Sequence, residues 1–201
     1  MGDKLLKNKK STNSMDKNSI IQEAEKFMRE NIPKSRIING SSEIYLRHVL
    51  GARKYALKLA ETYKADKFVI EVAALLHDVG ADAGKEHADE SAKISRKFLS
   101  KFDISDKIKE KIIHCIQNHS MGSKAETIEE QTIQDADGII FIEDTFKFYF
   151  EIQKQKFSLD EARTLSIEKT KGMMKKIKTE EGVKLAKNFL AKSLEYLKSA
   201  S

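Results

Sequence analysis

The sequence predicts an all-α fold, and three observations support this prediction. One proline and nine glycines in 201 residues leave few interruptions of helices. Apolar residues recur at intervals of three and four along most of the chain, and no segment alternates convincingly as a strand would. The composition, 40% hydrophobic and 34% charged, is that of a globular protein. We expect a disordered basic tail over residues 1–15 and a single domain over residues 16–201, with a core at 43–145 and additional C-terminal helices at 146–199.

The net charge of +6 is concentrated at the two ends of the chain. Five lysines against two aspartates give residues 1–17 a charge of +3, and thirteen basic against seven acidic residues give 147–201 a charge of +6. The middle therefore carries −3. We interpret the basic ends as solvated surface, and the lack of a Gly-rich or aromatic nucleic-acid module argues against a nucleic-acid partner.

The distribution of cysteine and of apolar residues bears on the compartment. Cys115 is the only cysteine, so no intramolecular disulfide can form, which favours a reducing compartment. No apolar run reaches the roughly 18 residues of a membrane span, and the N-terminal segment does not resemble a secretory signal. We expect a cytoplasmic protein without a membrane partner, and the sequence is compatible with a homo-oligomer.

Four helices are predicted in the first half of the chain. Helical spacing of apolar residues indicates helices over residues 16–30, 43–63 and 66–79, and a fourth that starts near residue 87. A connector with one proline and one glycine separates the first two. Ser41 or Ser42 can cap the second. These helices place apolar stripes toward a common core.

The second half is predicted to continue with helices over residues 105–119, 127–144, 158–177 and 179–198. Two of them begin with a capping box, formed by Thr127 with Glu130 and by Ser158 with Glu161. The helix at 127–144 is apolar on nearly all sides, which indicates a central buried helix. The aromatic stretch 145–150 is expected to continue the core or to line a pocket.

The stretch ALLHDVG, residues 74–80, holds the strongest chemical signal. An apolar helical run ends in His77 and Asp78, two adjacent side chains that can both bind a cation. A helix interior rarely hides such a pair unless it is ion-paired or bound to metal. Gly80 follows, and we expect it to end the helix in a left-handed cap.

Further ligand-type residues share the inner faces of other predicted helices. They are His48, His87, His119 and one of Asp135 and Asp137, which periodicity does not distinguish. His114 lies off the inner face of its helix and is expected to be peripheral. Five helices that each deliver such a residue to the core favour a bound cation. Imidazole and carboxylate ligands suit Mn, Fe, Co, Ni or Zn better than hydrated Mg.

These residues resemble the HD superfamily of metal-dependent phosphohydrolases. The similarity is carried by RHVLGARKYALKLA with His48, by ALLHDVG with His77 and Asp78, and by QDADGI with Asp137, within residues 43–145. The resemblance implies that these four residues bind a divalent cation, and it selects Asp137 over Asp135. From the chemistry of such ligands we expect Asp78 to bind the cation, orient the attacking water and accept its proton.

Some members of the superfamily hold a second metal ion, and this sequence matches them at two further positions. His87 in KEHADESA and His119 in IQNHSMG correspond to their additional ligands. The resemblance therefore implies one or two ions. The runs HVLG and HSMG are similar to bacterial hydrolases of diadenosine tetraphosphate, and QDAD is similar to small HD nucleotide pyrophosphohydrolases. A small phosphorylated substrate, in particular a nucleotide, is the expected partner.

The chain departs from the family at two basic positions. Ala81 stands where many members have a lysine, and Gly138 stands where some have an arginine. Arg53, Lys85 and Lys124 are candidates to replace these phosphate contacts. The departures leave open a non-catalytic HD module that binds metal and nucleotide in a regulatory role. A helical nucleic-acid-binding protein that uses the basic C-terminal helices is a third hypothesis, which a steep salt dependence of binding would support.

Overall fold

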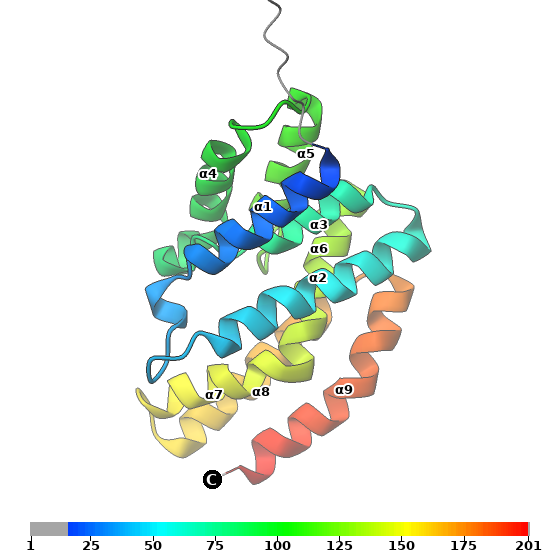
Figure 1. Cartoon of the computed structure of the whole chain (residues 1–201). Coiled ribbons are helices and arrows are strands. Elements are labelled where there is room, and N and C mark those ends of the chain that lie inside the picture. Colours follow the sequence, from blue (N-terminus) through cyan, green and yellow to red (C-terminus); the bar gives the residue numbers. More distant parts are fainter. Residues whose placement is uncertain (1–15, 201) are drawn as a thin grey trace, which may run out of the picture.

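The computed structural model describes residues 16–200 and consists of helices joined by short connections (Figure 1). This confirms the all-α prediction. The predicted tail at 1–15 lies outside the described residues. In chain order the elements are α1 (Lys17–Glu30), the 3₁₀ turn η1 (Lys34–Arg36), α2 (Glu43–Tyr63), α3 (Lys67–Leu76), the 3₁₀ segment η2 (Ala81–Glu86), α4 (His87–Leu99), α5 (Asp106–Gln117), α6 (Ile128–Ile140), the π-turn η3 (Phe141–Thr145), α7 (Phe146–Lys154), α8 (Leu159–Lys176) and α9 (Glu180–Ser199).

Two helices form the centre of the molecule. Every residue of α3 except Lys67 and Glu71 is buried, and so are residues 132–140 of α6. Helix α2 packs against both, while α1, α4 and α5 cover one end and α7, α8 and α9 cover the other (Figure 1). The prediction that the apolar helix after residue 127 is central is therefore confirmed. None of the helices within residues 16–200 combines the length and the apolarity needed to span a membrane.

The predicted capping boxes differ in how completely they form. At the start of α8, Ser158 accepts from the backbone N–H of Glu161, and the Glu161 carboxylate accepts from the backbone N–H of Ser158. At the start of α6, Thr127 accepts from the backbone N–H of Glu130 at 3.2 Å. The Glu130 carboxylate instead accepts from the backbone N–H of Glu126, so the second box is only half formed. Both arrangements satisfy donors that a helix start leaves free.

The prediction of a left-handed cap at Gly80 is wrong. Helix α3 ends at Leu76, and Gly80 lies in the following turn with φ −100° and ψ 18°. The glycine is required for a steric reason, because a Cβ atom there would lie 2.4 Å from the backbone nitrogen of Ser91. The backbone N–H of Gly80 also donates to the Ser91 hydroxyl at 2.9 Å. This close approach holds α4 directly against the turn that contains His77 and Asp78.

The segment after α6 departs from a regular helix. The prediction carried one helix to residue 144, whereas α6 ends at Ile140 and continues through a π-turn into α7. Such turns occur frequently at functional sites, because the extra residue changes which side chains face inward. Phe146 and Phe150 enter the core, while Thr145, Phe148 and Tyr149 line a pocket. Both expectations for the aromatic stretch therefore hold.

Candidate metal centre

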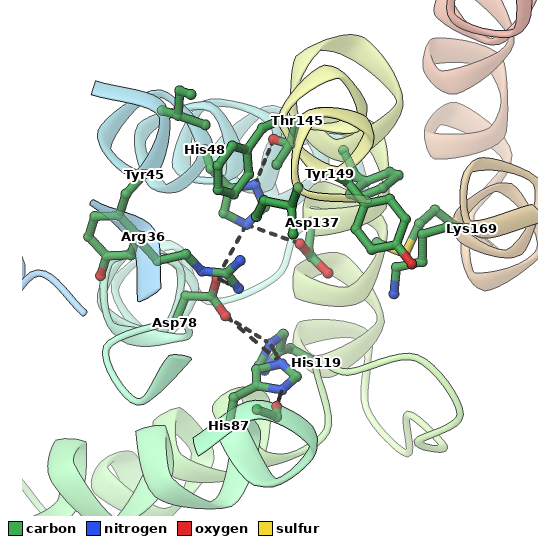
Figure 2. Close-up of a pocket in the computed structure, with 16 residues that line it drawn as sticks. Arg36, Tyr45, His48, Asp78, His87, His119, Asp137, Thr145, Tyr149 and Lys169 are labelled. Atoms are coloured by element: carbon green, nitrogen blue, oxygen red, sulfur yellow. Dashed lines mark hydrogen bonds and ion pairs between the residues drawn. The ribbon is translucent and has the colours of Figure 1, made fainter. Parts of the chain in front are cut away.

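The residues predicted as metal ligands converge at one place between α2, α3, α4, α5 and α6 (Figure 2). Helix α2 carries His48, and the tight turn after α3 carries the His77–Asp78 doublet. The remaining three are His87 at the start of α4, His119 just after α5, and Asp137 on α6. His87 is partly exposed and the other five are buried. Segments that are far apart in the sequence thus form one cluster.

Three of the histidines are fixed in the same way by their own backbone. The Nδ1 atoms of His77, His87 and His119 lie 2.8, 2.9 and 2.6 Å from a carbonyl oxygen three residues earlier. A carbonyl oxygen can only accept, so each Nδ1 carries the proton and donates it. Each Nε2 is therefore left with a lone pair. A hydrogen bond of this kind is the usual support of a metal-binding imidazole.

His48 is oriented by a side chain from the π-turn. Its Nδ1 lies 3.0 Å from the Thr145 hydroxyl, which in turn lies 3.5 Å from the carbonyl oxygen of Ile140. When the hydroxyl donates to that carbonyl, it accepts from Nδ1 of His48. The Nε2 atom of His48 then also carries a free lone pair, and it faces the cluster.

The free nitrogens face one another in two pairs. Nε2 of His48 lies 3.2 Å from Nε2 of His77, and Nε2 of His87 lies 3.1 Å from Nε2 of His119. Two lone pairs at this separation repel unless a proton or a cation lies between them. Burial lowers the pKa of His77 to about 4 and also lowers the pKa of His87, which disfavours an added proton on these rings at neutral pH. A metal cation at each pair would bind these lone pairs and remove the repulsion.

Asp78 lies between the two pairs of histidines. Its Oδ2 is 3.8 Å from Nε2 of His48, and its Oδ1 is 3.7 Å from Nε2 of His119 and 3.9 Å from Nε2 of His87. Two groups with metal-ligating geometry result, His48–His77–Asp78 and Asp78–His87–His119, and the ligand atoms within each lie within 4.8 Å of one another. Such spacings suit ligands that surround one ion at about 2.0–2.2 Å.

Asp137 adds a fourth ligand-type atom to the first group. Its Oδ1 lies 3.2 Å from Nε2 of His48, while its Oδ2 accepts from the ammonium of Lys176. Burial opposes ionisation of both Asp78 and Asp137. The Arg36 guanidinium, 3.3 Å from Asp78, and the Lys176 ammonium outweigh this effect and hold the pKa of both carboxyls well below their usual range. Both carboxylates are therefore charged and available to a cation.

A pocket of about 240 Å³ opens onto these ligands (Figure 2). Its polar part is formed by Arg36, Lys169 and several of the ligands. The rest of its wall is mainly aromatic and aliphatic and comprises Ile44, Tyr45, Phe141, Phe148, Tyr149, Ile152 and Met173. A pocket with basic and metal-ligand-type residues on one side and an apolar wall on the other can accommodate a molecule with one anionic end and one flat or apolar end.

The structure does not bring the three predicted phosphate-binding side chains to this pocket. Arg53 is held by carboxylates of Glu25, at 2.9 Å, and Glu71. Lys85 and Lys124 line a separate polar depression at the ends of α4 and α5. Arg53 is not available to a phosphate because these two acids already neutralise its guanidinium.

The two aspartates of QDAD have different surroundings. Asp137 faces the histidines, whereas Asp135 accepts hydrogen bonds from the backbone N–H groups of Lys178 and Thr179, both at 2.9 Å. Asp135 therefore holds the turn between α8 and α9 and lies outside both ligand groups. His114 is exposed, as its position off the inner face predicted.

Four polar residues that contact the ligand-type side chains or line the pocket were not identified as site residues from the sequence. They are Arg36, Thr145, Lys169 and Lys176. The two lysines lie seven residues apart, on one face of α8, and this spacing was a usable signal. Arg36 lies in a three-residue turn, and Thr145 depends on the π-turn, so neither position has a periodic pattern that could have indicated it.

Comparisons with known proteins agree with this geometry. The family model of the HD domain matches residues 45–141, a range that includes all six of the ligand-type residues. Bacillus subtilis YpgQ is 19% identical, with 92% of this chain and 95% of that chain covered and a TM-score of 0.70. YpgQ in complex with ADP is 20% identical, with 91% and 94% covered and a TM-score of 0.65.

An HD-superfamily hydrolase from Bacillus thuringiensis is also similar. It is 21% identical, with 92% of this chain and 100% of that chain covered and a TM-score of 0.68. At this level of identity the similarity shows a shared fold over nearly the whole chain. The family match, which spans His48, the His77–Asp78 doublet and Asp137, shows that residues 45–141 belong to the HD superfamily, and the structural similarity agrees with it in fold.

Proposed function

We propose that the protein is a metal-dependent phosphohydrolase that cleaves a phosphoester or phosphoanhydride bond of a nucleotide or another small phosphorylated compound. One observation carries the proposal. Four imidazole rings have Nδ1 engaged with an oxygen, and their Nε2 atoms converge around the charged Asp78 and Asp137. Burying so many polar atoms is costly unless a bound cation compensates for it.

The ligand set suggests which cation fits. Imidazole nitrogen and carboxylate oxygen together favour Mn, Fe, Co, Ni or Zn, with one or two ions. His48, His77, Asp78 and Asp137 would hold the first ion, and Asp78, His87 and His119 would hold the second. A bound divalent cation supplies hydroxide near neutral pH, because it lowers the pKa of its water from 15.7 towards about 7.

Asp78 has the central role in this proposal. Its two oxygens point toward different pairs of histidines, so it would ligate a cation, orient the attacking water and accept the proton of that water. The Arg36 guanidinium keeps the carboxylate ionised, as a proton acceptor must be. The products would be a phosphate or phosphomonoester and an alcohol or a second phosphate.

The pocket wall supports a nucleotide as substrate. Ile44, Phe148, Tyr149 and Ile152 offer an apolar surface suited to a base, next to the cationic side of the pocket. The structural similarity to YpgQ, which has been crystallised with ADP, is consistent with this class of ligand. Binding of the base by the aromatic wall and of the phosphates by the polar side would fix the orientation of the substrate.

Hydrolysis by purified protein tests the proposal. Metal content is measured before and after chelation, and the chain is then reloaded with Mn, Fe, Co, Ni or Zn and incubated with nucleoside mono-, di- and triphosphates. Asp78→Asn should abolish metal-dependent hydrolysis, because an amide cannot accept the proton and is a poorer ligand. The matched control is Asp106→Asn, whose side chain is 98% exposed and lies outside the pocket.

The same measurements distinguish the proposed hydrolase from the regulatory alternative. A wild-type protein that binds metal and nucleotides but hydrolyses none of them with any cation would be a non-catalytic HD module. Equal activity of the Asp78→Asn and Asp106→Asn variants would show that the doublet is not the reaction centre.

The number of ions has its own test. His87→Ala or His119→Ala should lower the metal content from about two to about one per chain, while His48→Ala should affect the other site. Unchanged stoichiometry in the first two variants would assign His87 and His119 a structural role.

A further inference from the structure

Two basic side chains face the pocket from opposite sides and come from segments outside the family match. Arg36 belongs to the turn η1 before residue 45, and Lys169 belongs to α8 after residue 141. Figure 2 shows Arg36 against Asp78 on one side and Lys169 beside Tyr149 on the other. The role that we assign to them is binding of the substrate, and this role rests on the proposed function.

Lys169 is a half-buried cation without a close counter-charge. Within residues 16–200 no carboxylate forms an ion pair with its ammonium, which lies 5.8 Å from the centre of the Phe141 ring. Burial lowers the pKa of Lys169, and the charges of Asp137 and Asp78 act on it only from a distance. A partly desolvated ammonium in a pocket without a carboxylate partner is suited to an anionic ligand.

Arg36 uses only part of its hydrogen-bonding capacity. One of its terminal nitrogens lies 3.3 Å from Oδ2 of Asp78, but its Nε is buried and has no partner within the described residues. The hydroxyl of Tyr45, which also lines the pocket, is likewise buried without a partner there. A guanidinium has five donors, so Arg36 can bind further oxygens.

The turn that carries Arg36 is held in place by Asp82. Both carboxylate oxygens of Asp82 accept from this turn, one from the backbone N–H of Lys34 at 3.0 Å and the other from that of Ser35 at 2.7 Å. Asp82 lies in η2, four residues after Asp78. The turn and the metal-binding doublet are therefore fixed to each other, and Arg36 remains beside Asp78.

We propose that Arg36 exchanges partners when the site is loaded. Without metal its guanidinium neutralises Asp78. Once a divalent cation binds that carboxylate, the two positive charges repel, and Arg36 turns to the substrate phosphates, which it binds together with Lys169. Arg36 and Lys169 thereby supply the phosphate contacts that are absent at Ala81 and Gly138.

The exchange predicts opposite effects of one substitution on two affinities. Arg36→Met should strengthen Mn²⁺ binding to the metal-free protein about threefold or more, because a competing cation is removed. The same variant should weaken binding of imidodiphosphate, a pyrophosphate analogue, to the Mn²⁺-loaded protein roughly ten- to a hundredfold. Arg36→Lys should recover part of that loss, since it keeps the charge but not the planar fork. Lys169→Met should weaken imidodiphosphate binding about tenfold.

Isothermal titration calorimetry measures both affinities, and thermal unfolding checks that the variants are folded. Arg47→Met is the matched control, because Arg47 is 51% exposed, pairs with Glu43 and Asp144, and does not line the pocket. It should leave both affinities unchanged.

The outcomes distinguish this inference from the proposed function. A folded Arg36→Met variant that binds both ligands more weakly, or binds imidodiphosphate like the wild type, would overturn the exchange while the metal centre stands. A wild type that binds no divalent cation would instead refute the proposed function, and the exchange with it.

Discussion

Two aspartates that are two residues apart on α6 should respond to the same substitution in different ways. Asp135 is fully buried, and each of its oxygens accepts two hydrogen bonds. Oδ1 accepts from the Gln131 amide at 2.7 Å and from the backbone N–H of Lys178 at 2.9 Å. Oδ2 accepts from the backbone N–H of Thr179 at 2.9 Å and from the Thr179 hydroxyl. Asn at this position places an NH₂ group against one of the two backbone N–H donors.

The cost of Asp135→Asn can be worked out from these contacts. Whichever way the amide points, its NH₂ group faces one backbone N–H that cannot accept, while the Gln131 amide or the Thr179 hydroxyl can reorient to accept from it, so one hydrogen bond to a charged group is lost, at about 1.5–3 kcal/mol. We expect the free energy of unfolding to fall by about 1.5–3 kcal/mol, which corresponds to a decrease in Tm of about 3–12 °C for a chain of this length. Because Asp135 lies outside both ligand groups, the Mn²⁺ affinity of the folded protein should stay within about threefold of the wild type.

Asp137→Asn should instead change the affinity for Mn²⁺. The variant loses a carboxylate ligand next to His48, so Mn²⁺ affinity should fall by at least about tenfold. Urea unfolding of the metal-free proteins and calorimetric Mn²⁺ titrations compare the two variants. If Asp135→Asn removes Mn²⁺ binding at an unchanged Tm, then Asp135 is the ligand and the assignment of these two residues is reversed.

Three further predictions concern the surroundings of the ligands. Thr145→Val removes the acceptor for Nδ1 of His48 and should weaken Mn²⁺ binding about ten- to a hundredfold in calorimetry, whereas an unchanged affinity would mean that this hydrogen bond does not orient the ring. Gly80→Ala introduces a Cβ atom against the backbone of Ser91 and should lower the free energy of unfolding by about 1–3 kcal/mol in urea; a neutral effect would contradict the tight packing of α4. Burial lowers the pKa of His77 to about 4, so between about pH 6.5 and 4 the unfolded chain binds more protons than the folded one. The metal-free protein should therefore lose stability as pH falls through this window, and His77→Asn should show a shallower decline in urea midpoints.

The sequence predicted most helices because their apolar stripes are local patterns. A stripe at helical spacing reports which face is buried, and this was enough to place His48, His87 and His119 on inner faces. The same reasoning was insufficient for Asp135 and Asp137. Both are buried on a helix that is surrounded on all sides, so periodicity contains no information about which neighbour each one meets.

The basic residues around the site were hard to predict for a different reason. The pairing of Lys176 with Asp137 joins residues 39 positions apart, and that of Arg36 with Asp78 joins residues 42 apart. Such pairs depend on how whole elements pack and leave no trace in local spacing. Arg53 shows the opposite error, since it was a candidate for a phosphate contact, but its guanidinium pairs with Glu25 and Glu71.

The contacts of α6 connect the C-terminal helices to the metal centre. Asp135 binds the turn at Lys178 and Thr179, and Asp137 binds Lys176, so one stretch of α6 holds the junction of α8 and α9 through both aspartates. A chain that ended at residue 145 would leave Asp137 without its ammonium partner and Asp135 without its backbone donors. Two buried carboxylates would then be uncompensated, which is strongly unfavourable. The helices beyond residue 145 are thus part of what allows α6 to carry the charged carboxylate of Asp137 in the core, and the candidate metal centre depends on more of the chain than the segment that the family match covers.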